Sequence, residues 1–246
     1  REGIGYSQIE AGYPGTNAVF LLDRTYVIKL YNPVWKEFGV ERELHIALRS
    51  REVPIPRLVS SGQFVDRVEW DYLVTEFVEG TPIRELRDTL GQEDLIDIAT
   101  DLGKIVRALH DTDLTPLNNL TRQQETEEQL VARRRGEVVE ELRATGLLGD
   151  DVLEDLESHI GGAAAEFEND PPVLVHGDLT EDHLLLGRQG GRWVITGLLD
   201  FGDAHACPRE YDWPPLWFDL LRQDADALVA FFESYDPNIL VDSEFT

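Results

Sequence analysis

The chain has 246 residues, 42% of them apolar; this length and composition exclude a disordered polypeptide and allow one large domain or two lobes. Its 22 basic and 48 acidic residues give a formal charge of −26, which makes nucleic acids and anionic membranes poor partners and favours a cationic one. The single cysteine, Cys207, excludes an internal disulfide, and no apolar run reaches the length of a membrane span, so we expect a protein of the reducing cytoplasm.

The first part of the chain is predicted to form strands and one helix. In chain order, we expect strands at 18–22 and 26–31, a helix at 37–50, and strands at 57–60 and 72–78. The strands are rich in β-branched and aromatic residues, and two prolines, Pro54 and Pro56, end the helix. A Gly-Thr-Pro sequence at 80–82 then marks a boundary, which divides the chain into residues 1–79 and 80–246.

Beyond this boundary the pattern is mainly helical. We expect helices at 95–110, 123–145, 150–168 and 214–235, and strands at 173–176, 184–186 and 193–199. The first of these helices carries a continuous apolar stripe, which is typical of a helix that faces the core. A turn containing Gly190 and Gly191 joins the last two strands into a hairpin.

Two acidic segments follow apolar strands in this second part. Asp178 lies in a loop, next to Gly177, in the sequence His-Gly-Asp-Leu. Asp200 stands at the end of a strand in the sequence Asp-Phe-Gly, from which both carboxylate oxygens can face a cation. Either aspartate alone is also typical of a turn. Their occurrence in this order, separated by a short hairpin, predicts phosphoryl transfer, in which one acid orients the attacking hydroxyl and the other holds the metal.

On these residues the chain resembles the aminoglycoside phosphotransferase family, the small-molecule branch of the protein-kinase-like fold. Supporting segments lie at 53–57, 73–80 and 102–110. The resemblance implies an α+β, bilobal fold. Residues 1–79 would form an N-lobe, a small antiparallel sheet with one helix that covers the nucleotide. Residues 80–246 would form a larger, mainly helical C-lobe with the catalytic loops and the acceptor pocket.

The resemblance also implies roles for individual residues. Asp178 would be the catalytic base, and Lys29 would hold the α- and β-phosphates of the nucleotide. Glu43 would pair with Lys29, with Glu41 as the rival because the register of a helix is uncertain at the level of sequence.

The nucleotide would be ATP, with GTP as the alternative. Backbone groups of the hinge around Glu76 and Val78 would contact its base. Because such contacts need no particular side chain, the sequence alone does not test them.

The metal is expected on Asp200 and His183. The family places Asn five residues after the catalytic aspartate, whereas this chain has His183 there. Imidazole is a softer ligand than an amide oxygen, so Mn²⁺ becomes an alternative to Mg²⁺. Asp182 could take the metal instead, or His183 could be a loop residue that only forms hydrogen bonds.

The expected acceptor is a hydroxyl group of a small cationic antibiotic, most simply a hygromycin-like aminoglycoside, and the enzyme would confer resistance. Acidic and aromatic residues near the catalytic loops are candidates for binding it: Glu181, Asp182, Asp203, Glu210, Asp212, Trp213, Trp217 and Asp219. The alternative is that the aromatic residues belong to the core and the acids to the surface. A solvated acidic surface would equally explain the net charge.

Two other functions remain open at this stage. The first is a metabolic kinase of the same fold that acts on choline, homoserine, a macrolide or a sugar. The second is a catalytically weak nucleotide-binding module, which the histidine at position 183 favours and the joint presence of Asp178, Asp200 and Lys29 disfavours. We expect a monomer or a weak dimer.

Overall fold

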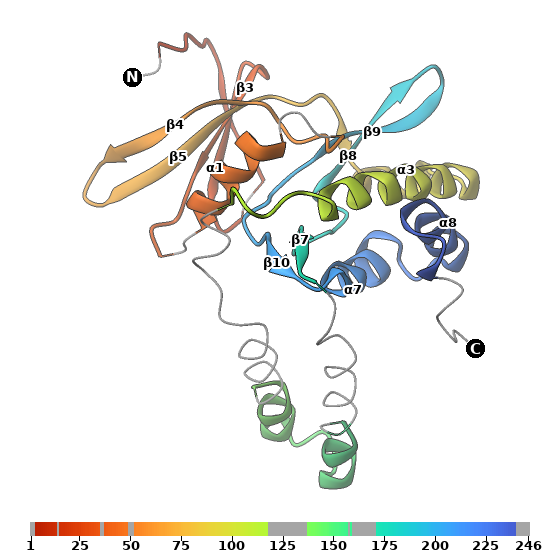
Figure 1. Cartoon of the computed structure of the whole chain (residues 1–246). Helices are drawn as coiled ribbons and strands as arrows, with labels where there is room; N and C mark the ends of the chain where they lie inside the picture. The colour runs from red at the N-terminus through yellow and green to blue at the C-terminus, as the bar shows by residue number, and fades with distance from the viewer. Residues whose placement is uncertain are drawn as a thin grey trace.

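The computed structural model describes residues 3–13, 15–34, 37–48, 52–117, 137–156, 158 and 171–239. Its N-terminal part is a five-stranded antiparallel sheet, with the strand order β1-β2-β3-β5-β4, and a helix against it (Figure 1). The strands are Ile9–Ala11 (β1), Ala18–Leu22 (β2), Tyr26–Leu30 (β3), Leu58–Val65 (β4) and Glu69–Glu76 (β5). Lys29 pairs with Leu73 in the register of β3 and β5, so it lies in the middle of the sheet.

The helix α1, Glu37–Ala47, packs against β4 and β5. Its buried residues are Val40, Glu41, Leu44 and His45, which follow the three- and four-residue spacing of one helix face. Two of the four are polar, so this face carries a carboxylate and an imidazole toward the sheet. The imidazole is satisfied locally, because His45 Nδ1 lies 2.8 Å from the carbonyl oxygen of Pro56.

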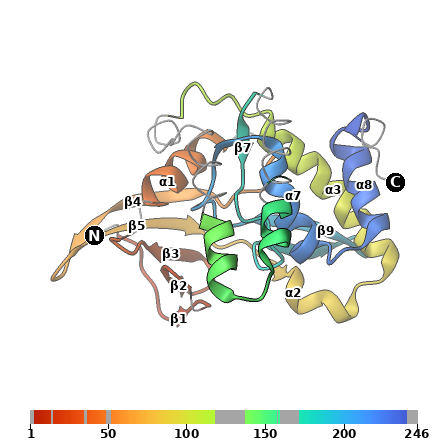
Figure 2. The ribbon, with the colours of Figure 1, turned by 90° about the horizontal axis from the view of Figure 1, so that it is seen from below.

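The C-terminal part combines helices with two small antiparallel sheets. The helices are α2 (Ile83–Leu86), α3 (Gln92–His110), α7 (Trp213–Pro215) and α8 (Ala225–Tyr235), with short helical turns η2 (Arg87–Thr89), η3 (Arg209–Asp212) and η4 (Leu216–Leu220). One sheet has the strand order β6-β8-β9, formed by Thr81–Pro82 (β6), Leu184–Gln189 (β8) and Arg192–Leu198 (β9). The other pairs Val173–Val175 (β7) with His205–Cys207 (β10). Figure 2 shows α3 and α8 side by side, away from the five-stranded sheet.

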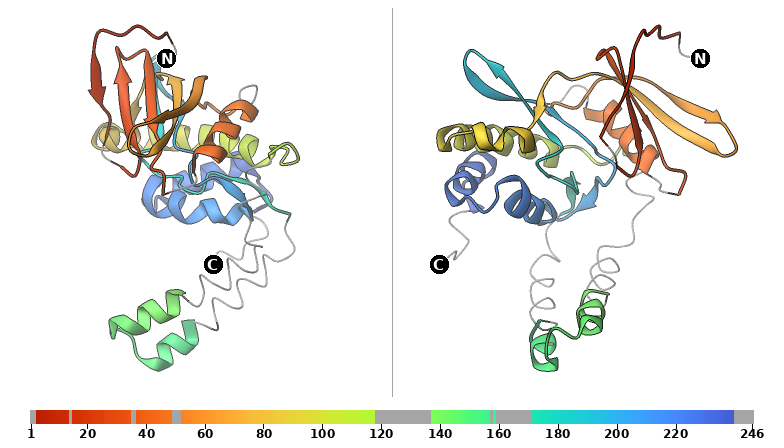
Figure 3. Two further views of the ribbon diagram at one scale, coloured as in Figure 1. Left: turned by 90° about the vertical axis from the view of Figure 1, so that its left-hand side faces the viewer. Right: turned by 180° about the vertical axis from the view of Figure 1, so that it is seen from behind.

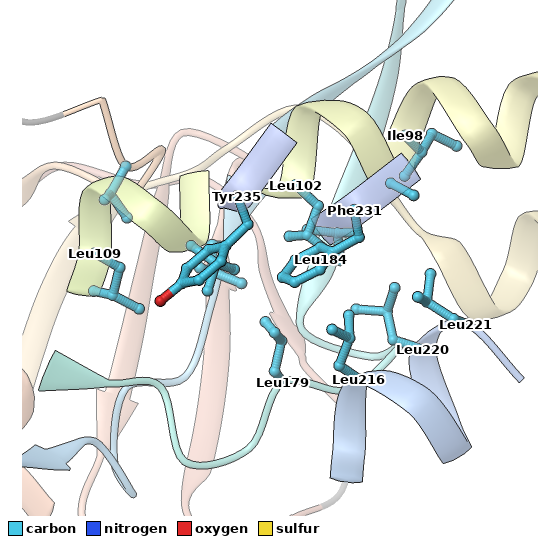
Figure 4. Close-up of a cluster of buried hydrophobic side chains, with 14 of the residues drawn as sticks. Ile98, Leu102, Leu109, Leu179, Leu184, Leu216, Leu220, Leu221, Phe231 and Tyr235 are labelled. Carbon is cyan, nitrogen blue, oxygen red and sulfur yellow. The ribbon is translucent and has the colours of Figure 1, made fainter. Parts of the chain in front are cut away.

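The hydrophobic core lies where α3 and α8 meet the residues around β8 and η4 (Figure 4). Leu102 of α3 and Phe231 of α8 are fully buried in it. Two other core residues lie in the loops that carry Asp178 and Asp200. Leu179 directly follows Asp178 and Phe201 directly follows Asp200, and both are 0% exposed. An apolar side chain next to each aspartate therefore fixes the loop that presents the carboxylate.

The expected α+β fold with an N-terminal antiparallel sheet and a helical C-terminal region is confirmed. The single helix expected at 214–235 is wrong: η4 ends before Arg222 and Gln223, whose φ angles of 48° and 62° are left-handed and cannot continue a helix. The helices expected at 123–145 and 150–168 lie partly outside the described residues, and 137–145 and 150–156 are helical (Figure 3). No helix in the described ranges is long and apolar enough to cross a membrane.

The packing of α3 on α8 depends on Gly103. A Cβ atom there would lie 2.1 Å from Ser234 Oγ and 2.4 Å from the carbonyl oxygen of Phe231. We predict that Gly103→Ala lowers the free energy of unfolding by about 1–3 kcal/mol, because the two helices must move apart. Urea denaturation of this variant and of Gly5→Ala, where a Cβ meets no atom within 4 Å, measures the difference. Equal stability of the two variants would contradict the prediction.

Candidate active site

The loop that follows β7 presents Asp178. Gly177 precedes it with a φ of 84°, and a Cβ at this position would lie 2.4 Å from the carbonyl oxygen of Asp203. Glycine is therefore required both for the left-handed backbone and for the close approach of the two loops. Asp178 itself is half-buried. Burial raises the pKa of its carboxyl, and the charge of Asp200 raises it further, while His183 opposes the shift.

Asp212 holds the backbone of this loop from behind. Its two carboxylate oxygens accept hydrogen bonds from the backbone N–H groups of His176 and Gly177, each at 2.9 Å, and His110 Nε2 lies 3.1 Å away. Asp212 is 0% exposed. Burial alone would raise the pKa of its carboxyl, but the hydrogen bond and charge of His110 outweigh burial and lower it.

The prediction that Asp212 contacts the acceptor is therefore wrong, whereas the contact expected of Trp213 stays a prediction, because Trp213 is only partly buried. Both carboxylate oxygens of Asp212 are already engaged in the interior, so it positions the loop of Asp178 instead. The ring of Trp213 packs against the core, with its centroid 5.3 Å from that of Phe232 and 5.2 Å from that of Tyr235. A sequence pattern of acids and aromatic residues does not reveal which side of the loop they face.

His176 connects the two acidic loops. Its Nε2 lies 3.0 Å from the carbonyl oxygen of Leu199, which can only accept, so this nitrogen carries the proton. Its Nδ1 then accepts from the backbone N–H of Asp178 at 3.3 Å. Burial lowers the pKa of His176, which favours this neutral form. A buried neutral imidazole thus links the loop of Asp178 to the loop of Asp200 through one hydrogen bond to each.

Asp200 follows β9 with a φ of 60°, a conformation that non-glycine residues adopt at a cost of about 1 kcal/mol or more. One of its oxygens, Oδ1, accepts a hydrogen bond from Lys29 Nζ at 2.7 Å. Lys29 is also bound to Glu41 Oε2 at 2.7 Å. Burial alone would lower the pKa of Lys29, but the two carboxylates outweigh burial and raise it.

The prediction that Glu43 pairs with Lys29 is wrong, and the rival Glu41 takes this place. Glu41 is 4% exposed, and its carboxylate also accepts a hydrogen bond from the hydroxyl of Tyr31 at 2.6 Å. The reason is the helix register: Glu41 lies three residues before Leu44 on the buried face, whereas Glu43, two residues beyond Glu41, points about 200° away around the helix.

His183 lies between the two aspartates. Its Nδ1 is 2.9 Å from the carbonyl oxygen of Asp178, so Nδ1 donates, and in the neutral imidazole Nε2 is the nitrogen that offers a lone pair to a metal. This Nε2 faces Asp200 Oδ2 at 3.7 Å. Two electron-pair donors that face each other at this distance leave room for a cation, since both can reach one divalent ion at about 2.0–2.2 Å.

The donor set therefore fits a metal that completes its coordination elsewhere. Asp200 supplies one carboxylate and His183 one imidazole, and within the described ranges no three His, Cys, Asp or Glu side chains form a complete site. Mg²⁺ and Mn²⁺ at phosphoryl-transfer sites are commonly held by one or two protein ligands, substrate phosphates and water. The two residues are thus suited to a nucleotide-bound cation rather than to a structural metal.

The other expected site residues lie around this cluster. Asp203 is an exposed residue beside the loop of Asp178, and partial desolvation together with the charges of Asp178 and Asp200 raises the pKa of its carboxyl. Asp182 is exposed and bound to Arg84 at 2.7 Å, and Trp217 is half-buried in η4. At the end of β5, the side chain of Glu76 is bound to Arg57.

The fold and much of the chain match known proteins. The model of the phosphotransferase enzyme family matches residues 6–242. Among curated proteins, the lysine-specific demethylase JMJ21 of Arabidopsis thaliana is 24% identical over 204 residues, which are 68% of this chain and 21% of that protein. The chain thus spans about a fifth of the length of this relative.

Solved structures of similar fold bind nucleotides and antibiotics. The GDP and kanamycin complex of APH(2")-IIia is similar with a TM-score of 0.75 and 20% identity, and the matched region covers 97% of this chain and 82% of that chain. The spectinomycin phosphotransferase APH(9)-Ia, in complex with ADP and spectinomycin, is similar with a TM-score of 0.63 and 16% identity. The matched region covers 95% of this chain and 76% of that chain. At these identities the likeness establishes the fold.

The buried pair of Lys29 and Glu41 gives a prediction about pH. Lys29 lowers the pKa of Glu41 to about 2, against an unfolded value of 4.5, although burial opposes the shift. We predict that Glu41→Gln lowers the free energy of unfolding by about 3 kcal/mol at pH 7. Because the folded-state pKa lies below the unfolded one, this difference is complete above about pH 4.5 and shrinks as the pH falls toward about 2.

Urea denaturation between pH 7 and pH 3 measures this difference. Glu154→Gln serves as the control, because Glu154 is exposed and forms no ion pair with the described residues. A stability difference for Glu41→Gln that stays constant over the whole range would contradict the assignment.

Proposed function

The chain belongs to the phosphotransferase enzyme family, and we propose that it transfers the γ-phosphoryl group of a nucleoside triphosphate to a hydroxyl group of a small molecule. One observation carries this proposal. Lys29, Asp200, His183 and Asp178 converge from β3, the end of β9 and the loop after β7, with His183 in reach of both carboxylates. Phosphoryl transfer depends mainly on such positioned charges, because the protein has little covalent chemistry to perform.

The nucleotide would lie between residues 1–79 and residues 80–246, which we propose as the two lobes. Lys29, oriented by Glu41, would neutralise the α- and β-phosphates. The base would be contacted by the backbone of Val78, for which the described part of the chain provides no hydrogen-bond partner. Glu76 is less suited, because its N–H already donates to the carbonyl oxygen of Arg57 at 2.9 Å. The donor would be ATP, with GTP as the alternative.

In the proposed reaction, Asp178 orients the acceptor hydroxyl and takes its proton. The hydroxyl oxygen forms a bond to the γ-phosphorus while the bond to the bridging oxygen breaks, and the nucleoside diphosphate leaves. Asp200 and His183 would hold a divalent cation, Mg²⁺ or Mn²⁺, which supplies neutralisation of the phosphate charge.

As acceptor we propose a cationic antibiotic, an aminoglycoside of the hygromycin kind, so that the cytoplasmic enzyme would confer resistance. The negative charge of Asp178 raises the pKa of the Asp203 carboxyl, and a bound ammonium group would relieve this repulsion. Asp203 is free of an ion pair among the described residues and is the best-placed acceptor contact. The other candidates are less available, because Asp182 is already bound to Arg84 and Trp217 is half-buried. The kanamycin- and spectinomycin-bound neighbours agree with this class of acceptor.

The proposal is tested by nucleotide consumption against a panel of acceptors. We predict turnover with one or more aminoglycosides, and a loss of about 10²–10⁴-fold in kcat for Asp178→Asn with unchanged nucleotide binding, because only the base is removed. Asp66→Asn, an exposed change in the β4–β5 turn, is the matched control.

Turnover confined to choline, homoserine, macrolides or sugars would replace the antibiotic by a metabolic acceptor. Nucleotide binding without consumption for every acceptor would contradict the proposed function and identify a binding module. Full activity of Asp178→Asn would contradict the role of that residue.

A further inference from the structure

A buried carboxylate lies in the loop of Asp178, and it has partners different from those of Asp178 and His183. Glu181, three residues after Asp178, is 4% exposed, and three arginines surround it. We call Glu181, Arg84, Arg87 and Arg222 the Glu181 cluster. The distances to the carboxylate oxygens are 3.0 Å from Arg84 Nε, 3.1 Å from Arg87 Nε, and 3.1 Å and 2.9 Å from Arg222 Nε and Nη2.

The arginines come from two distant parts of the chain. Arg84 and Arg87 belong to α2 and η2, whereas Arg222 follows η4. Arg222 forms a two-pronged contact with the carboxylate from a left-handed backbone with a φ of 48°. Arg87 directs Nε at Glu181, while its Nη2 is buried and has no hydrogen-bond partner in the described part of the chain. Two local costs, a strained backbone and an unsatisfied donor, are therefore tolerated at this contact.

Stability alone does not explain such an arrangement. Removing charges from water offsets most of their attraction, and apolar residues of similar size often stabilise a protein as well or better. What the cluster does provide is a fixed position for one point of the loop. The backbone N–H of Glu181 is held as well, because it donates to Asp219 Oδ1 at 2.7 Å.

The segment fixed in this way carries both groups of the proposed chemistry. The carbonyl oxygen of Asp178 accepts hydrogen bonds from the N–H of Thr180 and from His183 Nδ1, each at 2.9 Å. The N–H of His183 in turn donates to the carbonyl oxygen of Thr180 at 3.2 Å. Residues 178–183 thus form a closed turn, and the side chain of Glu181 attaches this turn to the three arginines.

We propose that Glu181 is a positioning residue: through Arg84, Arg87 and Arg222 it holds the turn of residues 178–183 so that Asp178 and His183 face the nucleotide together. This inference rests on the proposed function for its catalytic consequence. Its structural part, that the cluster immobilises the turn, stands independently of turnover. The same contacts exclude the earlier expectation that Glu181 binds the acceptor.

The test uses Glu181→Gln, which keeps the size of the side chain and removes its charge, and Arg222→Lys, which keeps the charge and removes the two-pronged contact. Glu233→Gln, an exposed change on α8, is the matched control. Hydrogen–deuterium exchange reports on the mobility of residues 178–183, and steady-state kinetics separate kcat from the KM for nucleotide.

We expect faster exchange in residues 178–183 for both variants, with the segments outside the Glu181 cluster unchanged. We also expect a fall of about 10–100-fold in kcat with a nucleotide KM within about twofold of wild type, because a shift of about 1 Å at the reacting groups is enough for such a loss. Unchanged exchange in this segment would overturn the inference. So would faster exchange with wild-type kcat. If the wild type shows no turnover, the proposed function fails, and exchange alone decides whether the cluster holds the turn.

Discussion

The ion pair between Lys29 and Asp200 joins two parts of the chain that are 171 residues apart in sequence. Lys29 comes from the middle of the five-stranded sheet, and Asp200 from the loop after β9. Because Lys29 is charged and largely buried, leaving it unpaired would carry a large cost in free energy, whereas its partner Asp200 is exposed. Every other functional contact is arranged around this link between the N-terminal sheet and the C-terminal loops.

The loops themselves are held on two sides. Apolar anchors, Leu179 and Phe201, insert into the core directly after the two aspartates. Behind the first loop, Asp212 satisfies the backbone N–H groups of His176 and Gly177. The carboxylates of Asp178 and Asp200 therefore lie on backbone that cannot shift without breaking buried contacts, which is the preorganisation that catalysis by positioned charges requires.

The sequence predicts the two aspartates of the site better than it predicts the residues that hold them in place. Asp178 and Asp200 were identifiable because each follows an apolar strand in a distinctive sequence, and their loops indeed meet. Glu41 could have been preferred over Glu43, since it lies on the same face as Val40 and Leu44, and a carboxylate that reaches the sheet must lie on that face.

Other features depended on distant contacts. Asp212 looks like an exposed acid next to aromatic residues, and only the fold shows the backbone of the Asp178 loop packed on it. Glu181 is similar, because its three arginine partners lie 41 to 97 residues away in sequence and no local pattern predicts their convergence.

The most direct test of the central claim is the effect of Mn²⁺ on ATP binding, measured by titration calorimetry for the wild type and for Asp200→Asn. If Asp200 and His183 share one nucleotide-bound cation, Mn²⁺ strengthens ATP binding to the wild type by about tenfold or more, and Asp200→Asn removes this gain. Equal ATP affinity with and without Mn²⁺ in the wild type, or the same gain in Asp200→Asn, would contradict the account.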